Sequence, residues 1–483
     1  MWGQIINLFS FLAFVWLSIQ LVRSIFFWLF LWQRKEYRWD RIKAHFSLPL
    51  GRSQLAAVFS PLSLTFWRKP KITLRILLLL LGFLIFGLRF YFLILRAMAE
   101  IIREWPLALF PAFTLALLIL FLLTPILMGL LNGLLGLMLE PFYSLALLLA
   151  KKKLEKFKPL VIGITGSFGK TATKQIIKQI LAVKFKVLAT EQSINTPLGI
   201  AKTVLFKLKP DHQIFVVEMG AYKKGEIKQL AESVRPEIGL LTGINFQHQR
   251  LFGSQKKIIE EKYQLIKSLP KDGLALFNGE NSICNDLAKT TKKVKVKIYH
   301  FPVKDYPTPL LGRFQQLNIQ AALEVADYLR ISRSEALKAV KKLKPSFLTL
   351  QLRKGWRNSR VLDNSYNSNP DGFEQALEIL GQLSAKKKIV VTAGIIELGN
   401  QAEKIHRRLG RKISQTADQL ILINNNFSPS IKKGADKKFV DKIRVIDDKV
   451  ELKKYFEKVI NREVVILLEG WNWEAKKMLL KKR

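Results

Sequence analysis

The hydrophobic and polar positions divide the chain into two parts of different character. Four long apolar stretches occupy residues 5–32, 73–95, 106–124 and 126–150. A helix needs about 20 apolar residues to cross the bilayer core, and four such stretches within 150 residues do not fit buried core helices. A cleaved signal peptide does not fit the first stretch, which is long and lacks a basic start. The pattern therefore predicts an α-helical transmembrane anchor region over 1–150.

From residue 151 onward, short apolar runs alternate with amphipathic helices. Strands are predicted at 160–164, 213–217, 237–242, 360–363, 388–393, 419–423 and 463–468. This alternation is typical of a parallel sheet covered by helices. A break near Pro345, after the helical segment 333–344, divides this part of the chain. We therefore predict an α/β fold, with a central domain over 151–345 and a smaller Rossmann-like C-terminal domain over 346–483.

Charge adds a second distinction between the two parts. The 483 residues carry a formal net charge of +41. Residues 1–150 contain only 14 basic and 5 acidic side chains, so most of the excess positive charge lies in the rest of the chain. A basic excess is compatible with a nucleic-acid partner, with an anionic membrane surface, or with a lysine-rich genome. Because no RNP motif, zinc finger or basic zipper is present, we expect no nucleic-acid partner. The single cysteine, Cys284, excludes an intramolecular disulfide framework and a thiolate zinc cage.

A glycine-rich turn follows the first predicted strand of the α/β part. The segment Thr165-Gly-Ser-Phe-Gly-Lys-Thr171 leads into an amphipathic helix, and this order of strand, turn and helix is the context of a phosphate-binding P-loop. Gly166 and Gly169 would let backbone N–H groups approach phosphates. Lys170 would neutralise the β/γ-phosphates, and Thr171 would offer its hydroxyl to Mg²⁺. The strict pattern has a glycine six residues before the lysine, where this chain has Ile164, with Gly163 one position earlier. A chance glycine-rich turn is therefore the alternative.

Further blocks resemble one enzyme family. Together with the P-loop segment, Asn195-Thr-Pro-Leu-Gly199 and Val217-Glu-Met-Gly220 resemble the Mur ligases, the ATP-dependent amide ligases of peptidoglycan synthesis. The block 243–254 is similar to the family block whose histidine, here His248, binds a second metal ion. The family usually has an asparagine where this chain has Gly243. Fourteen residues after His248, Lys262 matches a lysine that family members carry as a carbamate.

The C-terminal part extends the resemblance. Val361-Leu-Asp-Asn-Ser-Tyr-Asn-Ser-Asn-Pro-Asp371, and Glu397-Leu-Gly399 followed by His406, are most similar to the family member that joins D-alanyl-D-alanine to a UDP-linked muramoyl tripeptide. The resemblance covers about 160–483 and implies ATP and two Mg²⁺ ions as cofactors. The implied catalytic residues are Lys170, His248 and Lys262. The implied nucleotide-binding residues are Gly166, Ser167, Gly169, Lys170, Thr171, Asn195, Asn318 and Asp363. The implied metal ligands are Thr171, Glu218, His248 and a carbamylated Lys262.

Several positions depart from the family pattern. At the adenine end, Phe314 and Gln315 replace a histidine and an asparagine, and Thr349 replaces an arginine for which Arg353 is a stand-in. In the last domain, Asn364 replaces the second acid of a pair, and Glu469 lies where the family member has a lysine. The incoming amine therefore stays open between a dipeptide and an amino acid. Two alternatives to a ligase that adds D-alanyl-D-alanine to a muropeptide therefore stay open. One is a nucleotide-binding, non-ligating membrane scaffold or regulator. The other is a Mur-type ligase that makes another γ-linked or amide-linked product.

The anchor region replaces the domain that binds the UDP-sugar in ordinary family members. A lipid-linked precursor presented at the membrane is therefore an alternative to a soluble muropeptide as acyl substrate. The basic residues of the segment 34–71 place that segment in the cytoplasm. A domain that uses ATP is cytoplasmic too, so an even number of crossings separates 71 from 151. We therefore predict that 126–150 is interfacial or re-entrant, in a multi-pass protein of the cytoplasmic membrane. The residues that break up this stretch are Pro125, Gly129, Gly133, Gly136 and Pro141.

Overall fold

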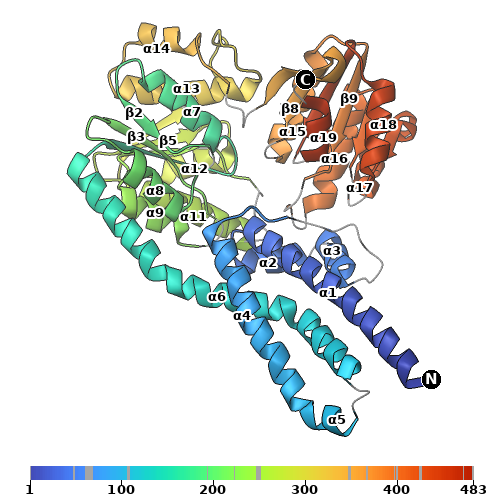
Figure 1. Ribbon diagram of the computed structural model, residues 1–483. Coiled ribbons are helices and arrows are strands. Elements are labelled where there is room, and N and C mark those ends of the chain that lie inside the picture. The colour runs from blue at the N-terminus through green and yellow to red at the C-terminus, as the bar shows by residue number, and fades with distance from the viewer. Residues whose placement is uncertain are drawn as a thin grey trace. The chain divides into compact units, whose positions relative to one another are not determined.

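The computed structural model divides the chain into two compact units, Met1–Ser144 and Leu145–Arg483 (Figure 1). It describes residues 2–46, 49–59, 69–105, 109–192, 194–221, 224–245, 252–345, 350–365, 368–395, 398, 401–423, 427–470 and 473–480.

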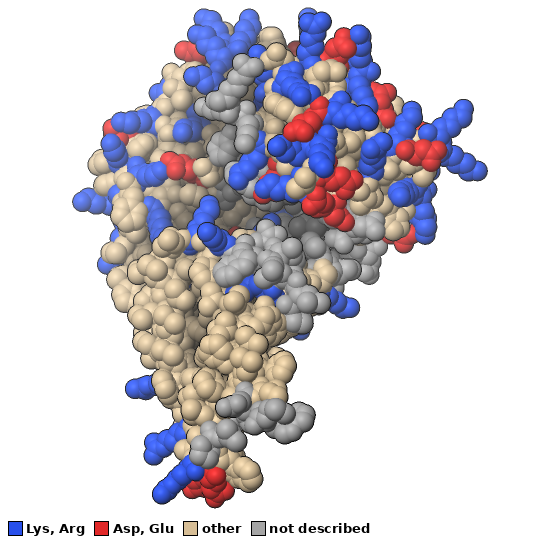
Figure 2. Space-filling model, turned by 45° about the vertical axis from the view of Figure 1, so that its right-hand side comes forward, with Lys and Arg blue, Asp and Glu red and all other residues tan. Residues whose placement is uncertain are grey.

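The first unit is helical. Its elements are α1 (Trp2–Arg34), α2 (Trp39–Phe46), α3 (Pro49–Phe59), α4 (Leu74–Ala97), α5 (Ala99–Glu104) and the first part of α6 (Leu109–Phe157). Trp28, Leu29 and Trp32 of α1 are buried in one cluster with Leu79 and Phe83 of α4. Three helices, Ile5–Arg34, Leu74–Ala97 and Leu109–Phe157, are long and apolar enough to cross a membrane, by length and composition alone. On the face that Figure 2 shows, few charged side chains interrupt the described surface of this unit.

The predicted break after Pro125 is wrong. Residues 106–124 and 126–150 were expected to form separate segments, but α6 is one continuous helix that contains Pro125 and Pro141. A proline removes one backbone hydrogen bond from a helix, and a long helix of apolar residues tolerates this loss where neighbouring contacts hold it. Among the described residues that follow 71, two helices, Leu74–Ala97 and Leu109–Phe157, are long and apolar enough to cross a membrane. The cytoplasmic location of the parts that flank them stays a prediction.

The second unit contains two six-stranded sheets. The first has the order β2-β3-β1-β4-β5-β6, and the second β11-β10-β9-β12-β8-β7. The first sheet contains β1 (Leu160–Thr165), β2 (Val187–Ala189), β3 (Ile214–Glu218), β4 (Ile238–Leu241), β5 (Leu274–Asn278) and β6 (Lys295–Tyr299). Its helices are α7 (Lys170–Leu181), α8 (Pro197–Lys207), α9 (Glu226–Val234), α11 (Gln255–Lys267), α12 (Ser282–Thr290), α13 (Arg313–Tyr328) and α14 (Arg333–Val340).

The second sheet is parallel apart from β7, which pairs antiparallel with β8. Its strands are β7 (Gln351–Lys354), β8 (Arg360–Asn364), β9 (Lys387–Thr392), β10 (Gln419–Leu422), β11 (Ile443–Val445) and β12 (Val464–Glu469). Its helices are α15 (Pro370–Gln382), α16 (Ala402–Thr416), α17 (Ser428–Gly434), α18 (Lys449–Val459) and α19 (Trp473–Leu480), with the 3-10 turns Trp356–Asn358 and Lys437–Lys442. All seven predicted strands are present, and the predicted parallel α/β architecture is confirmed.

Alternating side chains of the first sheet enter two different cores. Val161, Phe215 and Val217 point into a cluster with residues of α8, α9 and α11, whereas Ile162 and Val216 point into a cluster with residues of α7, α13 and α14. Successive strand residues face opposite sides, so both faces of the sheet are covered, as Figure 1 shows. Ligands of such sheets bind at the carboxyl ends of the strands, which leaves that edge for the site.

Candidate functional site

The P-loop is held against the end of β4 by its backbone. The N–H of Ser167 donates to the carbonyl of Gly243 at 2.7 Å. Gly166 has a φ of +153°, and a Cβ there would lie 2.1 Å from Thr242 Oγ1. Gly169 has a φ of +78° and precedes the first residue of α7. Only glycine adopts these conformations without strain or collision, so the loop can approach a ligand with its backbone.

Two lysine side chains converge on one oxygen of this loop. Lys170 Nζ donates to the carbonyl of Gly166 at 2.8 Å, and Lys262 Nζ, from α11, donates to the same oxygen at 2.9 Å. Burial lowers the pKa of both lysines, that of Lys262 to about 7 with a further contribution from the nearby Lys170 charge. Two ammonium groups beside a glycine-rich turn create a positive locus, and a polyphosphate is the anion that such a locus accommodates.

A carboxylate lies beside this positive locus. Glu218, the last residue of β3, is 1% exposed. Its Oε2 accepts hydrogen bonds from Thr171 Oγ1 at 2.9 Å and from Lys174 Nζ at 2.9 Å. Its Oε1 has a longer contact, 3.4 Å, with Asn195 Nδ2. Hydroxyl and carboxylate oxygens are ligands that Mg²⁺ accepts. Thr171 and Glu218 lie next to each other at the carboxyl edge of the sheet, so their oxygens are suited to bind such an ion.

Most of the expected site residues therefore lie together. Gly166, Ser167, Gly169, Lys170, Thr171, Asn195, Glu218 and Lys262 surround the P-loop. Asn318 of α13 lies beside them, because its Oδ1 accepts from Thr173 Oγ1 at 3.0 Å. His248 and Thr349 lie outside the described residues. Among the described residues, no group of three or more His, Cys, Asp or Glu side chains is arranged to hold a metal ion.

Lys174 is a site residue that the sequence reasoning missed. Its side chain is fully buried, and it pairs with Glu218 and with the carbonyl of Gln192. The available signal was its position on α7, where Lys174 falls on the same face as the apolar Ile177 and Leu181. A lysine on the buried face of an amphipathic helix requires an acidic partner, and Glu218 was the carboxylate expected nearby.

Aromatic side chains cluster beside Phe168 of the P-loop, near the positions where Phe314 and Gln315 replace a histidine and an asparagine of the family pattern. The rings of Phe168 and Phe314 meet edge to face with centroids 6.2 Å apart, and Phe301 lies 6.1 Å from Phe314. The guanidinium of Arg313 lies over the ring of Phe301 at 4.5 Å. Gln315 does not face outward but is buried, and its Oε1 accepts from Asn318 Nδ2 at 3.3 Å. Phe314 therefore presents ring surface where the family has a histidine, while the amide of Gln315 is engaged by Asn318.

The departure at Gly243 has a steric cause. Gly243 has a φ of +150°, and a Cβ there would lie 2.3 Å from Phe168 Cζ. The phenylalanine in the P-loop and the glycine after β4 therefore depend on each other, since a side chain at one position excludes the ring at the other.

We expect Gly243→Ala to destabilise the protein by about 1–3 kcal/mol, because backbone strain and the collision with Phe168 add. Gly225→Ala is the matched control: Gly225 has a φ of +94° with no atom within 4 Å of its built Cβ, so strain acts there alone. Thermal melting of both variants, and of Gly243→Ala combined with Phe168→Ser, checks this. An equal loss in Gly243→Ala and Gly225→Ala would show that the ring plays no part.

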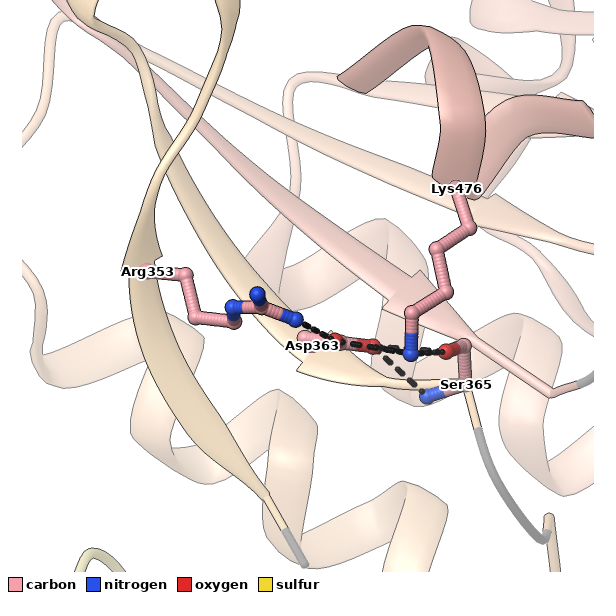
Figure 3. A network of polar contacts seen from close by, with 4 residues as sticks. All are labelled: Arg353, Asp363, Ser365 and Lys476. Carbon is pink, nitrogen blue, oxygen red and sulfur yellow. Dashed lines mark hydrogen bonds and ion pairs between the residues drawn. The ribbon is translucent and has the colours of Figure 1, made fainter. Parts of the chain in front are cut away.

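Asp363 belongs to the second sheet and lies in a polar network of its own. Figure 3 shows its carboxylate between two cations. Arg353 of β7 donates to its Oδ2 at 3.1 Å, and Lys476 of α19 contacts the same oxygen at 3.0 Å. Ser365 Oγ donates to its Oδ1 at 2.6 Å. Burial alone would raise the pKa of Asp363, but hydrogen bonds from Ser365 and Lys476 outweigh it and hold the pKa below its usual value. Asp363 therefore positions Arg353, the expected stand-in, and Lys476.

Glu469 ends β12, beside Asn364 at the end of β8. It is fully buried, and its oxygens accept from Asn364 Nδ2 at 2.7 Å and Ser368 Oγ at 2.6 Å. Neither partner carries a charge. Burial raises the pKa of Glu469 to about 8, although both hydrogen bonds oppose the shift. The glutamate that replaces the family's lysine is therefore a neutral hydrogen-bonding group at pH 7.

This pKa predicts a pH dependence of stability. Between the ordinary value of 4.5 and about 8, the unfolded chain loses the Glu469 proton while the native protein keeps it. The native state binds more protons in this window, so the contribution of Glu469 to stability falls as pH rises through it. We expect Glu469→Gln to melt progressively higher than wild type from pH 5 to pH 8. Glu451→Gln, at an exposed position of α18, controls for general charge effects, and a parallel shift in both variants would contradict the prediction.

Comparisons with known proteins place these domains. Residues 164–307 match the Mur ligase middle domain, and residues 350–470 match the Mur ligase, glutamate ligase domain. The chain is 27% identical over 344 residues to the UDP-N-acetylmuramoyl-tripeptide–D-alanyl-D-alanine ligase of Bacillus subtilis, covering 67% of this chain and 75% of that protein. It is 30% identical over 296 residues to the enzyme of the same name from Synechocystis, covering 56% of this chain and 63% of the relative.

Solved structures agree on the fold. The crystal structure of MurF from Acinetobacter baumannii superposes with a TM-score of 0.62 at 22% identity, covering 69% of this chain and 79% of that one. MurF from Thermotoga maritima, solved in complex with ADP, gives a TM-score of 0.60 at 24% identity and covers 70% of this chain and 81% of that one. With both domain profiles matched in order, this chain belongs to the Mur ligase family of ATP-dependent peptide ligases.

Proposed function

We propose that this protein is a membrane-attached ligase that joins D-alanyl-D-alanine, or a related amine, to a muropeptide precursor in cell-wall synthesis. One observation supports this most: Lys170 and Lys262 meet on one P-loop oxygen beside the Thr171–Glu218 contact. The named activity of the relatives, D-alanyl-D-alanine addition to a UDP-muramoyl tripeptide, supports the substrate class. We keep the division into an anchor over 1–150, a central domain over 151–345 and a C-terminal domain over 346–483 as part of this proposal.

The reaction makes a poor acylating agent reactive. The carboxylate of the precursor attacks the γ-phosphorus of ATP, ADP leaves, and the acyl phosphate so formed is attacked by the amine, which expels inorganic phosphate. Negative charge spreads over the transferred phosphoryl oxygens, so positioned cations provide most of the catalysis. Lys170 is placed to supply such charge at the P-loop. Thr171 and Glu218 would hold Mg²⁺, which would neutralise phosphate charge when bound.

Lys262 would serve as a second metal ligand after carbamylation. Only a neutral amine adds CO₂, and the pKa of about 7 leaves an appreciable neutral fraction of Lys262 at physiological pH. The resulting carbamate would exchange a buried cation for an oxygen ligand beside the P-loop, and His248 would complete this second site. Ligation that falls in CO₂-free buffer and returns with bicarbonate supports this step, while full activity without CO₂ contradicts it.

The helical unit would hold the enzyme in the cytoplasmic membrane with both ligase domains in the cytoplasm. The support is the three helices that are long and apolar enough to cross a membrane. The P-loop follows the end of α6 at Phe157 within about ten residues of chain, which leaves no room for a UDP-sugar domain between them. A lipid-linked precursor, brought to the site by the membrane itself, is therefore our preferred acyl substrate.

The deciding experiment is a ligation assay with the full chain in lipid nanodiscs. ATP, Mg²⁺ and D-alanyl-D-alanine are combined with either the UDP-linked tripeptide or its lipid-linked form, and product is identified by mass. We expect product, and phosphate release only when both acyl and amine substrates are present. A product containing another amine would support a different Mur-type specificity. Nucleotide binding with no product in any combination would favour a non-ligating scaffold, for which Phe314 and Glu469 are the motivating departures.

A further inference from the structure

The outward face of α16 carries a stripe of basic side chains. Residues at positions i, i+3, i+4 and i+7 of a helix share one face, and at these positions α16 has Lys404, Arg407, Arg408 and Arg411. The buried residues of the helix lie on the opposite face; they are Ile405, His406, Leu409, Gly410 and Ile413. With five basic residues and one acidic residue, α16 has an excess of four positive charges, the largest of any helix that the structure describes.

Helix α17 packs beside this stripe and completes a groove (Figure 1). The two helices meet through glycines, because a Cβ on Gly410 would collide with the carbonyl oxygen of Ile431, and a Cβ on Gly434 with that of Arg407. This close approach holds Lys433 next to the stripe. The groove between the helices has a volume of about 790 Å³, and we call it the basic groove. Its charged lining residues are Glu403, Lys404, Arg407, Arg408, Arg411 and Lys433.

Two carboxylates balance only part of this charge. Glu403 lies within the groove and contacts two of its cations, at 2.8 and 4.0 Å. Glu374 of α15 contacts the Arg408 guanidinium at 2.6 Å. In the part of the chain that the structure describes, no carboxylate comes within 4.0 Å of Lys404 or Arg411. The basic groove, with five cations and one acid, therefore keeps an excess of positive charge that an anionic partner would neutralise.

The exposure of these side chains favours an extended anionic surface over a small ligand. Arg407, Arg408 and Lys433 expose 49%, 53% and 63% of their side chains, whereas a small-molecule site encloses most of its ligand. Clustered, exposed basic side chains are the feature that anionic lipid surfaces attract. An anchored chain also keeps its domains close to one bilayer, so lipid phosphates are the polyanion with the highest local concentration.

We propose that the basic groove docks on the phosphate head groups of anionic membrane lipids. The proposal rests on the membrane attachment in the proposed function and extends it, because the anchor supplies the bilayer and the groove draws the C-terminal domain to its surface. The planar guanidinium groups would donate to phosphate oxygens in pairs, and the lysines would add charge without a fixed geometry. Docking would keep this domain beside a lipid-linked precursor. Because the attraction is electrostatic, salt should weaken it.

Energy transfer from a labelled α16 to a labelled lipid tests the proposal in the full chain. Gln415→Cys provides an exposed thiol for a donor dye on the outward face of α16, and the native Cys284 is buried. The acceptor is a head-group-labelled lipid in nanodiscs of phosphatidylcholine alone, or of phosphatidylcholine and phosphatidylglycerol in equal parts. We expect transfer to rise about 2-fold or more in the anionic discs and to fall back at high salt.

A pair of double variants, made in the labelled chain, shows whether the groove is responsible. Lys404→Gln with Arg411→Gln should remove most of the rise, because it takes two cations from the groove without breaking an ion pair of the described residues. Lys453→Gln with Lys454→Gln, at exposed positions of α18, changes the net charge equally and should keep the rise. Melting temperatures check that both variants fold.

Three results would overturn the proposal. The first is equal transfer in neutral and anionic discs. The second is a rise that the groove variant keeps, or that the α18 variant loses equally. The third is a donor signal that responds to single-stranded RNA or inorganic polyphosphate in solution but not to anionic lipid, which would assign the groove to a soluble polyanion.

Co-elution with nanodiscs separates this proposal from the proposed function. A chain that elutes with neutral discs is attached to the membrane whatever the groove does, so docking can fail alone. A chain that elutes without lipid would contradict the attachment and this proposal together. The groove variant should ligate the soluble UDP-linked tripeptide in detergent as wild type does, since its substituted side chains lie outside the site described above. Docking without ligation in the wild type would count against the proposed ligase activity alone.

Discussion

Lys170→Ala is expected to lower ATP-dependent ligation by at least about 100-fold while leaving the fold intact. The side chain lies at the start of α7 with its Nζ on the carbonyl of Gly166, where the phosphates of a nucleotide would meet the loop. Removing one preorganised donor to the charge of a transition state costs about 2.7–4 kcal/mol, and we expect a loss of this order when the Lys170 ammonium is removed. Lys170→Arg should not restore activity, since the planar guanidinium cannot replace a compact ammonium in the same space.

The matched control is Lys178→Ala, an exposed lysine on the same helix. It changes the net charge equally but leaves the P-loop untouched, so ligation should be as in wild type. Product formation by both variants is measured at saturating ATP, with melting temperatures as a check on folding. Activity in Lys170→Ala within a few-fold of wild type would remove Lys170 from the catalytic role and weaken the nucleotide site as a whole.

The second large effect is expected at the ion pair between Lys174 and Glu218. Both side chains are buried, with side-chain exposures of 0% and 2%, and their charged atoms are 2.9 Å apart. Burial lowers the pKa of Lys174, and the neighbouring Glu218 opposes that shift. Lys174→Met or Glu218→Gln alone leaves an uncompensated buried charge, so each should destabilise the central domain by about 3–5 kcal/mol. The double variant should lose about 1–3 kcal/mol less than the sum of the two.

Native-state hydrogen exchange of the β3 and α7 amides measures this cycle, because it reports the opening of the central domain in the full chain. The matched control is the pair Lys186 and Asp211 in the same domain, whose side chains are 54% and 55% exposed. Water screens that pair, so no measurable coupling is expected. Additive effects at Lys174 and Glu218 would contradict the ion pair. Strong coupling together with retained ligation in the double variant would contradict the assignment of Glu218 as a metal ligand.

The local features of the site were accessible from the sequence because they depend on neighbouring residues. The P-loop requires a strand, a glycine-rich turn and a helix in consecutive order, and the chain contains them over 160–181. Seven strands of the two sheets could be predicted because they are short apolar runs. The edge strands were not predicted, because an edge strand buries only part of its surface and is therefore shorter or less apolar; these strands are β2, β6, β7 and β11. β5, which lies inside the first sheet, was also not predicted; it is a run of five residues, Leu274–Asn278.

Contacts between segments that are distant along the chain could not be predicted from the sequence. No local pattern shows that Lys262 shares the carbonyl of Gly166 with Lys170, since 96 residues separate donor and acceptor. The interdependence of Phe168 and Gly243 likewise arises from the placement of the P-loop beside the end of β4. The continuity of α6 through Pro125 was misjudged for a related reason, because helix propensity describes a segment in isolation and omits the contacts that support it.

The sequence by itself determined the two-part organisation, the parallel α/β architecture, the P-loop and the family, because hydrophobic period and glycine spacing are properties of consecutive residues. Only the tertiary structure decided which charges are paired. It placed Lys174 on Glu218, surrounded Asp363 with two cations, and left Glu469 with neutral partners. The physical reason is that the state of an ionisable group depends on its burial and on the charges within a few ångströms, and the fold brings those charges from distant parts of the chain.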